Sequence, residues 1–432
     1  MYNFDIQKSQ ELGETTYITK LKNGLSVYIC KKKGFNKKIG MFGTKYGSIM
    51  NDFIDINANE RIKVPDGIAH FLEHKLFEKE GANALDLFSK MGVSSNAYTS
   101  FDHTVYYFET IEKFEDSIDM LVKLIKEPYF TDENVEKEQG IIGQEISMYD
   151  DDPGFMVYFN TLRAMYKDHP IKIDIAGTIE SISHITKELL YTCYNTFYSP
   201  QNMFFLVVGD VDVEDTVKRI EDNIRKYEKN YDNDTSKMQI EKYIELEDRT
   251  ITQKEINQKM DIYMPQLCIG YKLNVVPRED IIKREAICSI ISDMYFSKIT
   301  PFFEKEYNEG KIIEPISFDY EGSKYFSHVI ISSSTTKLEG LKKDIIEYIN
   351  KIKSEPIDEE LFSLIKKKKI GNIVFSADNL NISYRRIIES ILEDTSIYQD
   401  IECLNKVQPQ DIVDFLELLD EEYMVISSIT QK

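Results

Sequence analysis

The sequence predicts an α+β fold made of two similar domains, each a mainly antiparallel sheet flanked by helices. At 432 residues the chain is long for one hydrophobic core, and two domains of about 200 residues each are typical of this length. Its 42% apolar content, with 27 Tyr and 24 Phe, is ample for globular cores. Strand-like and helix-like stretches follow one another in loosely similar order in both halves, which suggests an internal duplication.

The first half begins with strand-like stretches. Residues 16–21 and 25–30 flank Asn23-Gly24, a strong signal for a two-residue hairpin. The further strands that we expect span residues 39–46, 93–100, 104–110 and 203–209. The expected helices span residues 67–76, 82–91, 111–126, 132–149 and 187–197, with two more that end near residues 166 and 227.

The second half follows a polar, charge-rich stretch. We therefore predict a first domain at 1–227, a linker at 228–255 and a second domain at 256–432. Strands are expected at residues 267–273, 316–320, 326–333 and 423–429, and helices at 280–296, 338–352, 358–375 and 410–418.

Charge and hydropathy exclude several classes of function. A net charge of -21 would repel nucleic-acid phosphates. No apolar run approaches the ~20 residues of a membrane span, and the first residues lack the basic and apolar regions of a signal peptide. The five cysteines never form a CxxC pair, which indicates reduced thiols and a cytoplasmic protein.

The stretch from Gly67 to His74 carries the clearest chemical pattern. On a helix, His70 and His74 stand one turn apart, and two imidazoles so placed can hold one metal ion. Glu73 leans towards the same ion but is too close in sequence to His74 to be an easy ligand. Its natural role is to take a proton from a water that the metal activates. The alternative is a helix with two unrelated histidines, although the chain has only six.

The long helix expected at 132–149 offers two candidates for a third ligand. Glu138 and Glu145 are seven residues apart and project from nearly the same face, so spacing alone does not choose between them. Gly140 and Gly143 are poor helix formers and suggest that another element approaches closely on that side. His103 follows Asp102 in a turn, where a histidine is more often structural than a ligand.

These motifs together resemble a known family. The sequence HFLEH at 70–74 after Pro-Asp-Gly-Ile-Ala, Ser95-Asn96-Ala97-Tyr98-Thr99-Ser100, and the run from Glu138 to Glu145 are similar to the pitrilysin/insulinase zinc peptidases, or inverzincins. The length resembles the two-domain branch that includes bacterial and mitochondrial-processing-peptidase-like proteins. The motifs cover the first half, whereas the second half matches mainly in length and order of elements.

The resemblance implies a zinc endopeptidase that cleaves flexible peptides. It makes His70, His74 and Glu145 the ligands of Zn²⁺ and Glu73 the general base. Glu138 would be a second acidic catalytic residue that orients His74. Asn96, Ala97 and Tyr98 lie where the family binds its peptide substrate as an added strand.

The second half departs from the family pattern. The family carries an Arg followed by a Tyr that contact the substrate, whereas alignment on Gly310 places Glu306 and Ile313 there. Neither side chain can stabilise an oxyanion. We therefore expect a heterodimer in which a homologous chain supplies Arg and Tyr. In the alternative, Lys305, Tyr307 or Lys311 substitutes after a small shift of register.

A competing function belongs to a different class. The missing Arg and Tyr also fit a peptide-binding assembly subunit whose zinc site is structural or vestigial. A purely structural site has no need of Glu73, which favours the enzyme.

Overall fold

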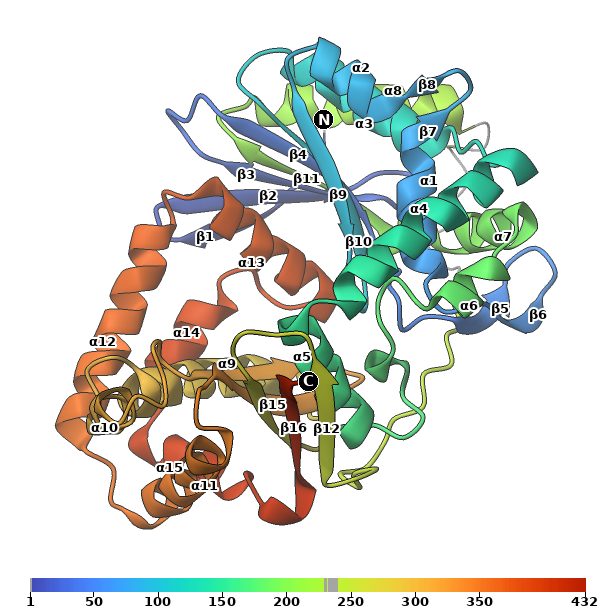
Figure 1. The fold of residues 1–432 in the computed structure, drawn as a ribbon. Helices are drawn as coiled ribbons and strands as arrows, with labels where there is room; N and C mark the ends of the chain where they lie inside the picture. The colour runs from blue at the N-terminus through green and yellow to red at the C-terminus, as the bar shows by residue number, and fades with distance from the viewer. Residues whose placement is uncertain (1, 229–230, 232–239) are drawn as a thin grey trace. The chain divides into compact units, whose positions relative to one another are not determined.

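The computed structural model describes residues 2–228, 231 and 240–432 (Figure 1). The chain forms two compact units, and each unit is built from three separate segments of the sequence. Unit 1 comprises Met1–Ile146, Asp174–Ile244 and Ser376–Tyr398, and unit 2 comprises Ser147–Ile173, Glu245–Phe375 and Gln399–Lys432. The predicted domains at 1–227 and 256–432, joined by a linker at 228–255, stay a prediction. Residues 229–230 and 232–239 of that linker lie outside the described residues.

Unit 1 is built on a seven-stranded sheet that is antiparallel except where β11 runs parallel to β3. Its spatial order is β1 (Asp5–Ser9), β2 (Glu14–Lys20), β3 (Ser26–Lys31), β11 (Met203–Gly209), β4 (Lys38–Thr44), β10 (Thr104–Thr110) and β9 (Ser94–Thr99). A hairpin is present at Asn23-Gly24, because β2 pairs with β3, but the predicted two-residue turn is wrong. Leu21 donates to the Leu25 carbonyl at 2.8 Å, so the loop has three residues and ends on Gly24 at a φ of 94°, a conformation that favours glycine. Strand β9 therefore ends the sheet with one free edge.

Helices cover both faces of this sheet. Helices α3 and α8 pack on β4, β10 and β3, and α13 packs on β11. The helices lying wholly or mainly in unit 1 are α1 (Ile68–Phe77), α2 (Ala84–Lys90), α3 (Phe114–Lys126), α4 (Asp132–Asp150), α6 (Ile179–Ser183), α7 (Lys187–Phe197), α8 (Val213–Tyr227) and α13 (Leu380–Glu393). Two short ribbons, β5–β6 (Asp52–Asp55, Glu60–Lys63) and β7–β8 (Glu78–Lys79, Ala82–Asn83), complete the unit.

Helix α13 comes from the C-terminal part of the chain, and the sequence did not predict it. Two lysines that directly follow β3 and β4 bind carbonyl groups near the two ends of this helical segment. Lys32 donates to the Ala377 carbonyl at 2.6 Å, and Lys45 donates to the Ile391 carbonyl at 2.7 Å. These bonds explain why Ser376–Tyr398 belongs to unit 1.

Unit 2 repeats the arrangement of five strands from unit 1. Its sheet has the order β12 (Glu255–Met260), β16 (Met424–Gln431), β13 (Gln266–Lys272), β15 (Ser327–Ser334) and β14 (Ser317–Gly322). The corresponding five strands of unit 1 have the order β3-β11-β4-β10-β9. Numbered along the chain, the five strands of each sheet lie in the order first, last, second, fourth, third. The first and last strands are parallel neighbours in both units. The shared topology supports the internal duplication, and the predicted α+β fold class is confirmed.

The helices of unit 2 include two, α10 (Pro301–Asn308) and α14 (Gln399–Lys406), that were not predicted from the sequence. The others are α5 (Pro153–Met165), α9 (Arg278–Ile291), α11 (Leu338–Ser354), α12 (Glu359–Ser376) and α15 (Pro409–Glu417). Helix α5 packs on β13 and β16. Gly270 permits this approach, because a Cβ there would lie 1.9 Å from the Met165 side chain.

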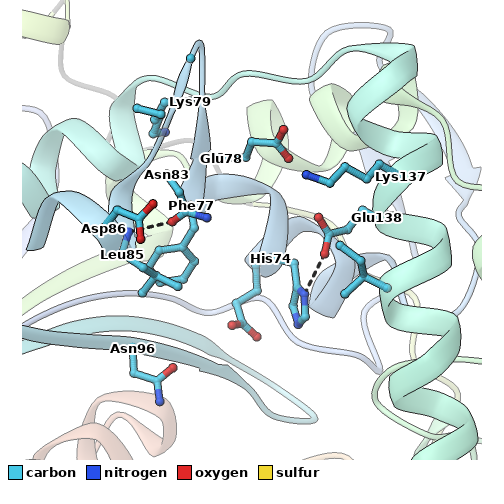
Figure 2. Close-up of a pocket in the computed structure, with 14 residues that line it drawn as sticks. His74, Phe77, Glu78, Lys79, Asn83, Leu85, Asp86, Asn96, Lys137 and Glu138 are labelled. Atoms are coloured by element: carbon cyan, nitrogen blue, oxygen red, sulfur yellow. Dashed lines mark hydrogen bonds and ion pairs between the residues drawn. The ribbon is translucent and has the colours of Figure 1, made fainter. Parts of the chain in front are cut away.

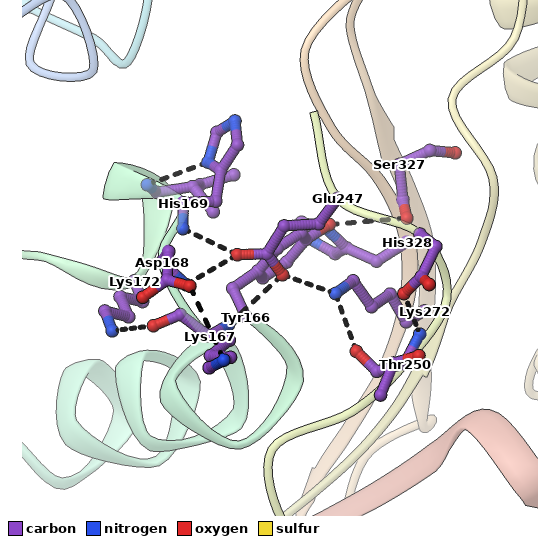
Figure 3. Close-up of polar contacts among 12 residues, drawn as sticks. Tyr166, Lys167, Asp168, His169, Lys172, Glu247, Thr250, Lys272, Ser327 and His328 are labelled. Atoms are coloured by element: carbon purple, nitrogen blue, oxygen red, sulfur yellow. Dashed lines mark hydrogen bonds and ion pairs between the residues drawn. The ribbon is translucent and has the colours of Figure 1, made fainter. Parts of the chain in front are cut away.

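The half-buried carboxylate of Glu247 binds the turn that follows α5 in unit 2 (Figure 3). Glu247 accepts hydrogen bonds from the backbone N–H groups of three consecutive residues, Lys167, Asp168 and His169, at 3.1, 2.6 and 2.7 Å. Lys272 donates to the same carboxylate at 2.6 Å. Burial alone would raise the pKa of Glu247, but these donors lower it to about 2. Glu247 is therefore ionised in the folded protein.

Two further observations concern the cysteines and the helices. All five cysteines are free thiols. Among the described residues, no helix combines the length and the apolar character needed to cross a bilayer.

Candidate metal centre

Helix α1 presents the two histidines because its other face is apolar. Ile68, Phe71, Leu72 and Leu76 are buried, which leaves His70 and His74 half-buried on the remaining face. The helix begins after Gly67, which has a φ of 89°. A Cβ on Gly67 would lie 2.3 Å from the Ala176 carbonyl oxygen, so only glycine fits this start.

Three side chains from α1 and α4 converge on one point. The Nε2 of His70 lies 3.8 Å from one oxygen of Glu145, and the Nε2 of His74 lies 3.6 Å from the other. Zinc bonds of about 2.0–2.1 Å in a tetrahedral site place neighbouring ligand atoms roughly 3.3–3.5 Å apart. Two imidazoles and one carboxylate at this spacing fit Zn²⁺ in both size and donor chemistry.

The structure separates the two carboxylates between which spacing could not choose. Glu145 faces both Nε2 atoms, whereas Glu138 lies behind His74 and its Oε1 accepts a hydrogen bond from Nδ1 at 3.1 Å (Figure 2). Burial opposes ionisation of Glu138, but the hydrogen bond to His74 and the ammonium of Lys75 lower its pKa. In the neutral form of His74, with Nδ1 donating to Glu138, the lone pair lies on Nε2, on the side of Glu145.

His70 is a neutral imidazole at neutral pH. Burial, reinforced by the neighbouring His74, lowers its pKa to about 3. Its Nδ1 is buried and has no hydrogen-bond partner among the described residues. A buried neutral imidazole with an available lone pair suits metal binding.

Glu73 lies beside this group and is 7% exposed. Burial raises the pKa of its carboxyl to about 7, which is the range expected of a general base at neutral pH. The hydroxyl of Thr99, on β9, donates to its Oε2 at 3.0 Å. Thr99 was not among the site residues predicted from the sequence. Strand alternation could have identified it, since Thr99 lies two positions after Ala97 and its side chain therefore points to the same face of the sheet.

The free edge of β9 carries the predicted substrate-binding residues. Ser100 donates to the His103 carbonyl at 2.8 Å, so the alternation of an antiparallel pair directs the N–H and C=O of Ala97 away from β10, towards the free edge. The Ala97 N–H is bonded by the side chain of Asn96 at 2.8 Å. A peptide that adds to this edge would take the place of that side chain.

Tyr98 and His103 belong to a separate polar contact. The Tyr98 hydroxyl lies 3.4 Å from Nε2 of His103, whose Nδ1 lies 2.7 Å from Asp102. His103 is not part of the group formed by His70, His74 and Glu145. That a histidine in this turn is structural stays a prediction.

A cavity of about 670 Å³ opens beside these residues within unit 1 (Figure 2). Glu73, His74 and Glu138 line one part of it. Phe77 and Leu85 also line it, and so do Asp86, Lys79 and Lys137, so it offers apolar surface and charges of both signs next to the candidate metal centre. A cavity of this size has room for side chains of a peptide.

One prediction about α4 is wrong. Gly140 and Gly143 do not mark a close approach, because a Cβ at either position would meet nothing within 4 Å. The helix accepts both glycines at the usual cost in helix propensity, about 1 kcal/mol each relative to alanine.

The positions aligned with the family's Arg and Tyr lie in unit 2 and differ in environment. Glu306 is 0% exposed and forms ion pairs with Lys305 and Lys311, each at 2.9 Å. Ile313 is 62% exposed. Glu306, Glu309 and Asp344 also gather their carboxylates, but the ammonium of Lys311 pairs with all three. A lysine thus occupies the place that a metal ion would take.

Comparisons with known proteins agree with this geometry. Residues 57–179 match the family described as "Insulinase (Peptidase family M16)", and residues 184–369 match "Peptidase M16 inactive domain". The chain is 39% identical over 410 residues to the uncharacterized zinc protease YmfH of Bacillus subtilis, with 94% of each chain covered. It is 31% identical to an M16-like peptidase of known structure from Alicyclobacillus acidocaldarius, with a TM-score of 0.91 and coverage of 98% and 100%. A protease from Helicobacter pylori, 19% identical, shares the fold with a TM-score of 0.81 over 96% and 99% of the two chains.

Proposed function

Because the chain belongs to the insulinase family, peptidase family M16, we propose that it is a zinc-dependent endopeptidase that cleaves flexible peptides. The observation that carries the proposal is the position of Glu73. This buried carboxylate, with a pKa raised by burial to about 7, lies next to His70, His74 and Glu145. A metal site with only a structural role does not require such a base.

In the proposed mechanism His70, His74 and Glu145 hold the zinc ion. Zinc, when bound, polarises the scissile carbonyl and acidifies water. Glu73 accepts the proton of the attacking water and then returns it to the leaving amine. Thr99 holds the Glu73 carboxylate in place through the bond at 3.0 Å.

The substrate is proposed to bind as an extra strand on the free edge of β9. The N–H and C=O of Ala97 would pair with the peptide main chain, and Asn96 and Tyr98 would flank it. Recognition through the main chain tolerates varied side chains but requires an extended segment. Flexible peptides or unstructured segments are therefore the proposed substrates.

We further propose that the active form is a heterodimer in the cytoplasm. Glu306 is buried in ion pairs and Ile313 has no donor, so neither can stabilise a developing oxyanion. A homologous chain would supply an Arg and a Tyr. The five free cysteines suit a reducing compartment.

The second candidate function is a peptide-binding assembly subunit with a structural or vestigial zinc site. The observation in its favour is the same pair of residues, Glu306 and Ile313, at the positions of the family's Arg and Tyr. It predicts bound zinc without hydrolysis, whether or not a partner is present.

The experiment combines zinc content with cleavage of an unstructured fluorogenic peptide, for the chain alone and with a homologous chain that lacks HxxEH. Glu73→Gln is expected to retain one zinc per chain and to lose roughly 10²–10⁴-fold in rate. Glu136→Gln, at an exposed position on α4, is the matched control and should change neither quantity. Full activity of Glu73→Gln would refute the mechanism. Equal activity with and without the partner would refute the heterodimer alone.

A further inference from the structure

Lys75 is a fully buried lysine immediately after the second histidine of the motif. Its side chain is 0% exposed, although it belongs to the helix that carries His70 and His74. Burying an ammonium group is costly unless charged and polar partners compensate it. A lysine at this position therefore needs partners in the structure.

The partners of Lys75 come from two elements. The ammonium group donates to the Asn134 carbonyl on α4 at 3.0 Å, lies 3.5 Å from Oε2 of Glu138, and pairs with Glu78 at the end of α1. The Glu138 side chain is itself only 10% exposed. Lys75 is thus the cation that faces the carboxylate behind His74.

The two oxygens of Glu138 are divided between two neighbours in sequence. Oε1 accepts from Nδ1 of His74 at 3.1 Å, and Oε2 faces Nζ of Lys75 at 3.5 Å. The terminal torsion of a glutamate is broad, so a carboxylate with one partner can rotate. The second partner restricts that rotation and keeps Oε1 directed at the imidazole.

We propose that Lys75 is a positioning residue for the metal centre, which acts through Glu138 to fix the ring and tautomer of His74. The inference rests on the proposed function, because it gives His74 the role of a zinc ligand. Groups that orient ligands in this way typically change metal affinity by 10–100-fold when they are lost. A merely structural lysine, joining α1 to α4 through Asn134, would alter stability without this dependence on Glu138.

The test measures the zinc dissociation constant of the full chain by titration of Zn²⁺ against a competing chelator, which requires no peptide hydrolysis. Lys75→Met removes the cation and keeps an unbranched apolar side chain. It is expected to weaken zinc binding by about 10–100-fold, as is Glu138→Gln. Lys126→Met is the matched control, because it removes another nearly buried lysine of unit 1, ion-paired with Glu228 at 2.6 Å and outside the metal centre. It should leave the dissociation constant within twofold.

The double variant Lys75→Met/Glu138→Gln separates positioning from general destabilisation. If Lys75 acts through Glu138, the double variant binds zinc as Glu138→Gln does. Should Lys75→Met alone fail to fold, the comparison of the double variant with Glu138→Gln decides the question, because it leaves no uncompensated carboxylate at 138. A further loss of affinity in the double variant overturns the proposal, as does an unchanged Lys75→Met. Failure of the wild-type chain to bind zinc would instead overturn the metal centre, and the role of Lys75 with it.

Discussion

Replacing Glu73 with glutamine should change the pH dependence of stability in a calculable way. The carboxyl is 7% exposed, and burial raises its pKa from 4.5 to about 7 in the metal-free fold. A raised carboxyl pKa means that the folded state binds the proton more tightly than the unfolded chain. The stability that this proton provides is therefore present below pH 4.5 and is lost as the pH rises to 7.

The magnitude follows from about 1.4 kcal/mol per pKa unit, which gives roughly 2–3 kcal/mol between pH 5 and 8. Glutamine does not titrate. The free energy of unfolding of the metal-free Glu73→Gln variant, relative to that of wild type, should therefore rise by this amount as the pH goes from 5 to 8. The assay is urea unfolding of both metal-free proteins at steps of pH. Groups that titrate in both proteins largely cancel in the difference.

Glu138→Gln is the matched comparison, because the same substitution should act with the opposite sign. Hydrogen bonding to His74 and the charge of Lys75 overcome burial and lower the Glu138 pKa, so its ionised form stabilises the fold above the unfolded pKa. The glutamine variant should be less stable than wild type, and by most at the acid end of the range, because the Glu138 carboxylate also raises the pKa of His74 and so stabilises its charged form there. If the difference for Glu73→Gln did not change between pH 5 and 8, the Glu73 carboxyl would ionise at its ordinary pKa, and the argument from burial would be refuted.

The other predictions concern the ligands, the strand edge and unit 2. Glu145→Gln should weaken zinc binding more than 100-fold, beyond the effect of outer-shell changes, in a chelator competition; binding within tenfold of wild type would exclude Glu145 as a ligand. Ala97→Pro removes one N–H from the free edge of β9, so KM for an unstructured peptide should rise roughly 5–10-fold at unchanged zinc content; an unchanged KM would argue against strand addition there. Glu306→Arg replaces the two ion pairs of the buried Glu306 with like charges, and a cost of about 3–5 kcal/mol should lower Tm by roughly 10 °C. Exposed Ile313→Tyr should leave Tm unchanged and serves as its control, and equal Tm values would contradict the role given to Glu306.

The sequence could predict the parts of the site that depend on local spacing. His70 and His74 face the same way because they are one helical turn apart, and burial of the apolar stripe on α1 determines which way that is. The hairpin at Asn23-Gly24 and the pairing of β9 with β10 follow from turn chemistry and alternation in the same way.

The features that the sequence could not predict depend on contacts between segments that are distant along the chain. Glu138 and Glu145 share a helix face, so only the position of α4 against α1 could assign them. Helix α13 joins unit 1 through Lys32 and Lys45, more than 300 residues earlier in the chain. Lys75 was not singled out, because its meaning comes from the carboxylates that surround it and not from its spacing to the histidines.

The structure also narrows how this chain could compensate for the absent Arg and Tyr. Of the three proposed substitutes, Lys311 has a side chain that is 11% exposed and is held by three carboxylates, so using it would break a buried network. Lys305 pairs with Glu306 at 2.9 Å and with Asp344 at 3.6 Å. Tyr307, 53% exposed, is the remaining candidate. A tyrosine can donate one hydrogen bond but brings no positive charge, and a developing oxyanion gains most from a charged donor. The arginine of the proposed partner chain would supply that charge.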